Sequence, residues 1–199
     1  MSTGRIVLLV LTLIMVTCST ERTPLSESEL MAYVMNPGNG TIVSQERDGI
    51  TFDMIYRPKD MVIASQVDDD PDRWKEEERR LDSLDYFVLR ISRDGEEIQN
   101  SFAGNEAKFN SAISWLGGRI ANDLYLVTDR KEHIPPDQTV FVPSFGMAKA
   151  TSVLIVFRSA LSQRKGKHSI VLRDSEFGTG MYEFSFDSEN IRSIPRLQR

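Results

Sequence analysis

The chain contains few of the side chains that usually act as nucleophiles or soft metal ligands. Among its 199 residues it has one cysteine, Cys18, and two histidines, His133 and His168. A single cysteine excludes an intramolecular disulfide framework and any zinc site built from several thiolates. Neither histidine belongs to an H-E-x-x-H sequence, which would place two ring nitrogens on one helix face. We therefore expect no metal centre and no cofactor, and we predict that both histidines lie on the surface.

Carboxylates are the remaining candidates for acid–base chemistry, since two of them suffice for glycoside hydrolysis. Four acids lie in loops at the ends of expected strands, where functional groups often occur: Glu132, Asp137, Asp174 and Glu176. The sequence has no G-x-S-x-G, G-x-x-x-x-G-K-[ST] or G-x-G-x-x-G motif. Hydrolysis by loop carboxylates therefore stays open as an alternative, and we assign no catalytic residue.

The acidic run from Asp68 to Asp72 resembles the start of a calcium-binding loop. The comparison fails, because an EF-hand needs Gly and Glu where this chain has Arg73 and Arg79. The run instead indicates the start of a solvated helix, with Asp70 as the N-cap and Pro71 in the first turn, and a loosely bound cation is the alternative. An apolar stripe and an ion pair are expected along that helix, formed by Trp74, Leu81 and Leu84 and by Glu76 with Arg80.

Cys18 stands at the end of the most informative segment of the chain. Arg5 precedes an apolar stretch from Ile6 to Val16 that only Thr12 interrupts. Eleven helical residues span about 17 Å, whereas the bilayer core is about 30 Å thick, so the stretch is too short to cross comfortably. A charged start, an apolar middle and a small residue near the cut are typical of a secretory signal.

The residues from Leu13 to Ser19 resemble the lipobox of bacterial lipoproteins, with Met15 and Thr17 where that family has Leu and a small residue. The resemblance implies cleavage before Cys18 and a lipid on its thiol. It also implies an outer-membrane location, because Ser19 replaces the aspartate that retains such proteins in the inner membrane. The alternative is a plain secretory signal with a chance cysteine. We expect a signal peptide at 1–17, a lipidated tether at 18–25 and one domain at 26–199.

The net charge of the chain limits the classes of binding partner to be expected. It has 24 basic and 29 acidic residues and a formal net charge of −5. A nucleic-acid binder needs a basic face, so nucleic acid is not an expected partner. The expected partners are the membrane, through Cys18, and envelope proteins.

Periodicity beyond residue 25 predicts a mixture of helices and strands. Ser26 and Glu29 form a capping box before a first helix, and Asp48-Gly49 predicts a hairpin turn. Further helices are expected at 58–67, 70–81, 106–116 and 188–194. Strands are expected at 41–45, 50–56, 86–92, 123–128, 139–143, 151–159, 169–173 and 181–186.

The expected strands follow one another without a βαβ rhythm, which favours antiparallel pairing. We therefore predict an α+β fold: an antiparallel sheet or sandwich of about eight short strands, with several peripheral helices. The chain as a whole resembles bacterial envelope lipoproteins with a small β-rich body, around Tyr33–Pro58 and Phe177–Phe186. This resemblance implies no particular biochemical activity for the chain.

Apolar residues in glycine-containing loops are candidates for partner binding: Phe145, Met147, Phe177 and Met181. Their alternative role is to cover an edge of the core. The tail arginines, Arg192, Arg196 and Arg199, are expected to be solvated, and contact with anionic headgroups or with an acid of a partner is the alternative. The leading hypothesis is a non-catalytic lipoprotein that binds or scaffolds another envelope component. The alternatives are a small hydrolase and a carrier of an apolar ligand between sheet and helices.

Overall fold

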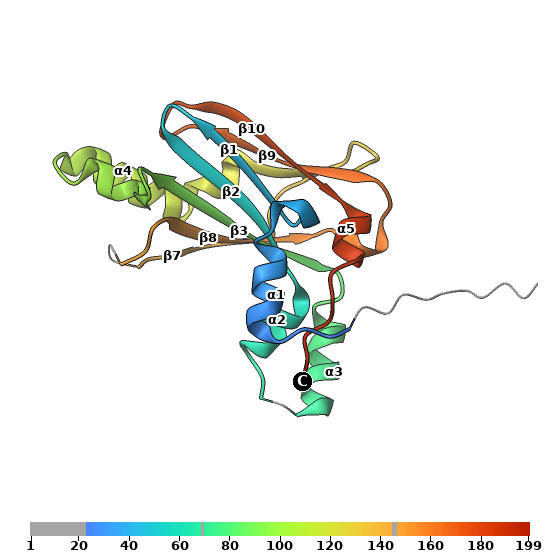
Figure 1. The fold of residues 1–199 in the computed structure, drawn as a ribbon. Coiled ribbons are helices and arrows are strands. Elements are labelled where there is room, and N and C mark those ends of the chain that lie inside the picture. The colour runs from blue at the N-terminus through green and yellow to red at the C-terminus, as the bar shows by residue number, and fades with distance from the viewer. Residues whose placement is uncertain (1–22, 69, 145–146) are drawn as a thin grey trace, which may run out of the picture.

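A computed structural model describes residues 23–68, 70–144 and 147–199. Within them, two antiparallel β-sheets face one another and helices lie at the periphery (Figure 1), which confirms the predicted α+β class. The predicted signal peptide, Cys18 and Phe145 lie outside the described residues. None of the helices in the described ranges combines the length and the apolar character needed to cross a membrane.

The first sheet has the strand order β1-β2-β3-β8-β7, with the short β4 paired to β3. Its strands are β1 (Ile42–Arg47), β2 (Ile50–Arg57), β3 (Leu84–Arg93), β4 (Glu96–Glu97), β7 (Gln138–Val142) and β8 (Thr151–Arg158). The second sheet has the order β10-β9-β5-β6. It contains β5 (Leu124–Val127), β6 (His133–Ile134), β9 (Lys167–Asp174) and β10 (Gly180–Asp187). The described residues thus form ten strands. The two strands beyond the eight expected are the two-residue strands β4 and β6.

Alternation of apolar and polar residues explains how these strands face the core. In β2, Ile50, Phe52 and Met54 are buried, while Thr51 and Asp53 between them are partly exposed. Asp48 and Gly49 both have positive φ angles and form the tight turn that joins β1 to β2. A one-residue slip would turn the apolar set outward, so this pattern fixes the register of the hairpin.

The main core lies between the two sheets. Large side chains of the first sheet, including Phe52 and Phe87, meet side chains of β10, including Tyr182 and Phe186. The ring centroids of Phe52 and Tyr182 are 4.4 Å apart. Aromatic rings therefore fill the space between the sheets.

Three helices cover part of the outer face of the first sheet: α1 (Glu27–Val34), α2 (Lys59–Ala64) and α3 (Pro71–Arg80). The predicted capping box of α1 is present, with the Ser26 side chain and Glu29 bonding reciprocally. Asp70 caps α3, as expected. The prediction that Arg80 forms an ion pair with Glu76 along α3 is wrong, because Arg80 pairs with Glu77.

The remaining helices lie at the ends of the sandwich. They are α4 (Glu106–Gly117) and α5 (Ser188–Arg192), with short 3-10 turns η1 (Pro37–Asn39), η2 (Ile98–Phe102), η3 (Arg119–Asp123) and η4 (Leu161–Gln163). Trp115 of α4 is buried and donates from Nε1 to Asp123 Oδ2 at 2.7 Å. In Figure 1, α4 lies at the opposite end of the molecule from α3.

The carboxyl-terminal tail is tied to the start of the folded body. Leu197 forms a parallel bridge with Leu25, flanked by backbone hydrogen bonds from Leu25 to Arg196 and from Gln198 to Leu25. The guanidinium carbon of Arg199 lies 4.7 Å from the centroid of the Trp74 ring. The side chains of Arg192, Arg196 and Arg199 are exposed, as expected, although Arg196 also contacts α2 and α3 and Arg199 lies over Trp74 of α3.

Candidate functional site

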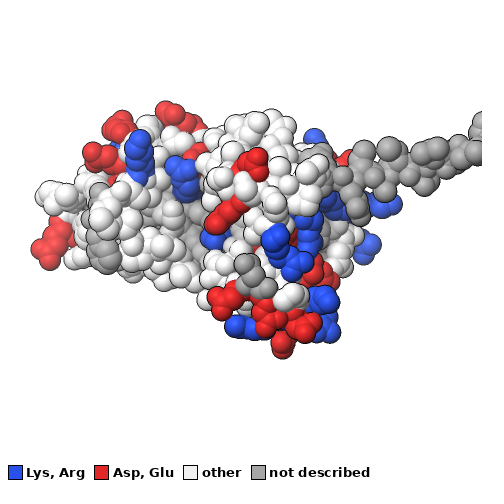
Figure 2. Space-filling model, turned by 60° about the horizontal axis from the view of Figure 1, so that its bottom comes forward, with Lys and Arg blue, Asp and Glu red and all other residues white. Residues whose placement is uncertain are grey.

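A polar cleft of about 280 Å³ opens between α2, α3, the η4 turn and the segment from α5 to the tail. Its lining carries three acids and three bases together with Tyr56, Ser162 and apolar residues; the charged set is Lys59, Asp60, Glu78, Asp82, Arg192 and Arg196. Figure 2 shows acidic and basic side chains intermixed at the end of the molecule that carries α3. No single sign of charge dominates this face.

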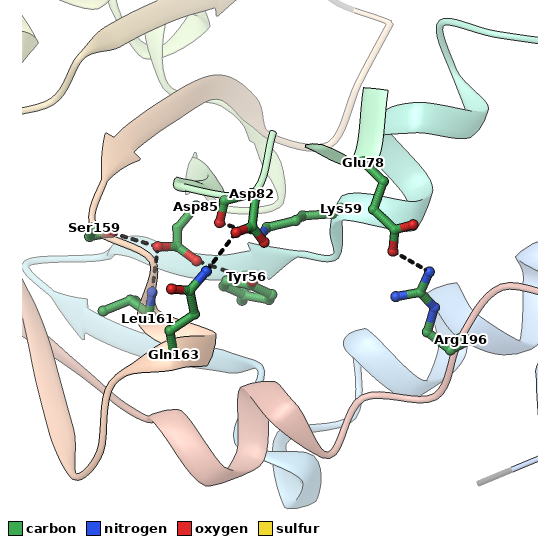
Figure 3. Close-up of polar contacts among 9 residues, drawn as sticks. All are labelled: Tyr56, Lys59, Glu78, Asp82, Asp85, Ser159, Leu161, Gln163 and Arg196. Atoms are coloured by element: carbon green, nitrogen blue, oxygen red, sulfur yellow. Dashed lines mark hydrogen bonds and ion pairs between the residues drawn. The ribbon is translucent and has the colours of Figure 1, made fainter. Parts of the chain in front are cut away.

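Asp85 accepts three hydrogen bonds, one of them from Tyr56 of the cleft lining (Figure 3). Ser159 Oγ and the Leu161 amide donate to its Oδ2 at 2.6 and 2.8 Å, and Tyr56 Oη donates to its Oδ1 at 3.3 Å. The residue is fully buried. Burial raises the pKa of the Asp85 carboxyl, whereas the donated hydrogen bonds and the charge of Lys59 oppose that rise.

Tyr56 lines the cleft and serves as a neutral hydrogen-bond donor to Asp85. Burial and the neighbouring Asp85 charge raise the pKa of the Tyr56 hydroxyl well above its usual value. It therefore stays protonated at neutral pH and continues to donate to Asp85. A phenol held in this way anchors the end of β2 to β3.

Lys59 and Asp82 form the outer layer of the same site (Figure 3). Lys59 Nζ donates to the backbone carbonyl of Asp82 at 2.6 Å and lies 3.4 Å from Asp82 Oδ1. Gln163 Nε2 donates to the other carboxylate oxygen of Asp82 at 2.8 Å. Residues of α2, the α3–β3 connection and η4 are thereby held together at one point.

Arg196 of the tail forms the opposite wall. Its Nε lies 3.1 Å from Asp60 Oδ2, and its Nη2 donates to Glu78 Oε1 at 2.7 Å. The Leu197 amide donates to the same Asp60 oxygen at 2.9 Å. The Asp60 side chain is only 10% exposed, so the tail supplies the donors that this nearly buried carboxylate needs.

The arrangement favours binding over proton transfer. The cleft carboxylates of Asp60, Glu78 and Asp82 each have a basic partner, and Asp85 accepts donors from the protein interior. The cleft lining thus combines acidic and basic side chains that are paired with one another. None of these residues was singled out from the sequence as a site, although Asp85 inside an apolar strand is the signal that a search for buried charge would use.

His168 is a second polar centre, and its predicted surface position was wrong. It is buried: the Asp129 amide donates to Nδ1 at 3.3 Å, and Nε2 lies 2.9 Å from Ser188 Oγ. Ser188 Oγ donates to the Leu161 carbonyl at 2.8 Å. The neutral ring therefore carries its proton on Nε2, and burial lowers the pKa of His168. A general base for Ser188 would need a free lone pair on Nε2, so the pair of side chains serves packing and hydrogen bonding.

The other histidine, His133, is exposed as predicted, with its ring stacked on that of Tyr125.

The four loop carboxylates have structural partners. Asp174 accepts from the amides of Glu176, Phe177 and Thr179. The other three form ion pairs, namely Glu176 with Arg119, Glu132 with Arg164 and Asp137 with Arg158. The hydrogen bond from Arg164 also lowers the pKa of Glu132.

The apolar loop residues are placed in different environments. Phe177 is half-buried, with its ring centroid 5.9 Å from that of Phe102 and 5.3 Å from that of Trp115. Met147 and Met181 are 85% and 59% exposed; Met147 follows β7 of the first sheet, whereas Met181 lies within β10 of the second. The structure therefore assigns Phe177 to the edge of the core and leaves the two methionines on the surface.

The described residues contain no group of three or more His, Cys, Asp and Glu side chains arranged to hold a metal ion. Comparison of the chain with known protein families, with curated protein sequences and with solved structures found no match.

Proposed function

We propose that this chain is a non-catalytic lipoprotein, anchored to the bacterial outer membrane through Cys18, that binds or scaffolds another envelope component. The observation that carries the anchor is the position of Cys18. It follows a short apolar stretch and precedes Leu25, where the hydrogen-bonded body begins, by seven residues. Seven extended residues reach about 25 Å, so a lipid on Cys18 would hold the body close to the membrane.

The proposed binding role is supported by the structural contacts that the acidic and nucleophilic side chains make. The loop carboxylates accept hydrogen bonds from loop amides or form ion pairs with arginines, and the ring of His168 donates to Ser188. Groups that already satisfy structural hydrogen bonds are poor candidates for a catalytic acid and base.

The polar cleft is the proposed contact for the partner. Its acidic and basic side chains suit a polar segment of an envelope protein, because such a segment can pair with both signs. The tail that lines the cleft also bridges Leu25, so a partner bound there would lie on the anchored side of the body.

The anchor is tested by metabolic labelling with a radioactive fatty acid in cells that produce the wild-type chain or Cys18→Ala. We expect label in the wild-type protein and none in the variant, because the thiol is the acceptor. Equal labelling of the two proteins would reject the lipid anchor.

The cleft is tested separately with a photo-crosslinking amino acid placed at Ser162, which lines it. Ser101, exposed in η2 near α4, is the matched control position. A protein adduct at position 162 that is absent at 101 is the expected result. An adduct at 101 alone would place the partner surface elsewhere.

A further inference from the structure

A second hollow lies between α1 and the outer face of the first sheet, and it differs in chemistry from the polar cleft. It is a groove of about 250 Å³ whose walls come from α1, α2, β2 and β3. Its charged lining residues are Glu27, Arg57 and Arg90, and the apolar residues used below are Met31, Met35, Ile55 and Val88.

The floor and walls of this groove are mainly apolar. Ile55 of β2 and Val88 of β3 are register partners and form the floor, while Met31 of α1 and Met35 at its C-cap form one wall. Met31 is 47% exposed, so the wall reaches solvent. Methionine side chains are flexible and polarisable and adapt to an apolar guest of irregular shape.

Two arginines flank this apolar floor. The neighbouring register pairs on the same face are Arg57 with Tyr86 on one side and Asp53 with Arg90 on the other. The Arg57 Nε atom is buried and has no hydrogen-bond partner among the described residues. A buried donor without an acceptor is costly, and an anionic group inside the groove would provide one.

We propose that this groove binds an amphiphile with one acyl chain and a carboxylate head, that is, a fatty acid. The guanidinium of Arg57 pairs with the carboxylate, while Ile55, Val88 and the methionines contact the chain. At roughly 30 Å³ for each water-sized group, the groove holds about eight methylene groups, so the rest of a longer chain lies outside it. This inference does not depend on the lipid anchor, since the groove belongs to the folded body.

The experiment measures displacement of the fluorescent fatty acid cis-parinaric acid by laurate and by dodecanol. The protein is the full chain carrying Cys18→Ala, which has no thiol-linked lipid of its own. We expect laurate to compete at least tenfold better than dodecanol, which has the same chain length and no charge. Two variants from different elements, Met31→Glu and Arg57→Gln, should each weaken laurate binding at least tenfold.

Met181→Glu is the matched control, because it makes the same substitution at an exposed methionine of the other sheet. It should leave laurate binding unchanged, and circular dichroism verifies that all variants are folded. Equal competition by dodecanol, or unchanged binding in Met31→Glu, would overturn the proposal. Binding by Cys18→Ala together with none by the lipidated wild-type chain would also overturn it, by assigning the groove to the chain's own lipid.

Discussion

Asp85 brings three donors together in a place that solvent does not reach. We expect Asp85→Ala to lower the free energy of unfolding by about 3 kcal/mol, because it leaves the Leu161 amide and two hydroxyls without their acceptor. Asp85→Asn keeps one acceptor oxygen and should cost less. Urea denaturation of the two variants measures the difference, and equal losses would show that the acceptor oxygen kept by Asn contributes nothing to stability.

His168 gives the folded protein a predictable response to acid. Burial lowers the pKa of His168 in the folded state, although Asp129, Asp85 and Asp187 favour its protonated form. The unfolded chain then binds the proton more readily, so this contribution to stability is complete above a pH of about 6.5 and is lost as the pH falls toward the lower folded value.

The variant His168→Gln tests this response, since an amide can accept from Asp129 and donate to Ser188 without titrating. We expect its unfolding free energy to change less than that of the wild type between pH about 7.5 and about 5.5. Other acids titrate in both proteins and cancel in the comparison. Identical pH dependence would mean that His168 is not a proton-linked site.

Gly40 and Gly49 both adopt left-handed backbone conformations, with φ angles of 66° and 72°. A Cβ atom on Gly40 would lie 2.2 Å from Asn190 Nδ2, whereas one on Gly49 would meet nothing within 4 Å. We expect Gly49→Ala to cost about 1 kcal/mol of backbone strain and Gly40→Ala to cost more, because Asn190 of α5 must also move. Thermal or urea denaturation compares the two variants, and a smaller loss for Gly40→Ala would contradict this packing.

At the scale of elements, the tail acts on α2 through Asp60. Truncation after Ile194 removes both Arg196 and the Leu197 amide from this carboxylate. We expect the truncation to cost about 2 kcal/mol more in the wild type than in an Asp60→Asn background, because only the charged group requires both donors. The wild type, the truncation, Asp60→Asn and their combination form a double-mutant cycle. Additive losses of unfolding free energy would show that the tail and Asp60 are not coupled.

Local elements were predictable from the sequence because their signals are local. The capping box at Ser26, the N-cap at Asp70 and the Asp48-Gly49 turn depend on residues within a few positions of one another. The polar cleft was not predictable in this way. Ser159 and Leu161 reach Asp85 from 74 and 76 residues away, and only the pairing of β3 with β8 brings them together.

The buried position of His168 was missed for the same reason. Its ring contacts Asp129 and Ser188, which are 39 and 20 residues away. A histidine next to a turn looks like a surface residue until the neighbouring strands are assembled. Long-range pairing therefore determines the polar sites, whereas short-range signals determine the helices and hairpins.

At the scale of the whole molecule, the two tryptophans mark opposite ends. Trp74 of α3 lies under Arg199, close to the tail that bridges Leu25, whereas Trp115 belongs to α4 at the other end (Figure 1). In vesicles that contain a dansyl lipid, we expect energy transfer to be stronger from Trp74, measured in Trp115→Phe, than from Trp115, measured in Trp74→Phe. Stronger transfer from Trp115 would contradict anchoring through the segment before Leu25.

The bridge between Leu25 and Leu197 also decides how the molecule responds to mechanical load. A pull on the amino-terminal segment enters the body at Leu25, and two flanking backbone hydrogen bonds pass it to the tail. Arg196 then distributes it to α2 through Asp60 and to α3 through Glu78. Tension between a membrane and a bound partner would thus be spread over several helices, and α1 would not have to carry it alone.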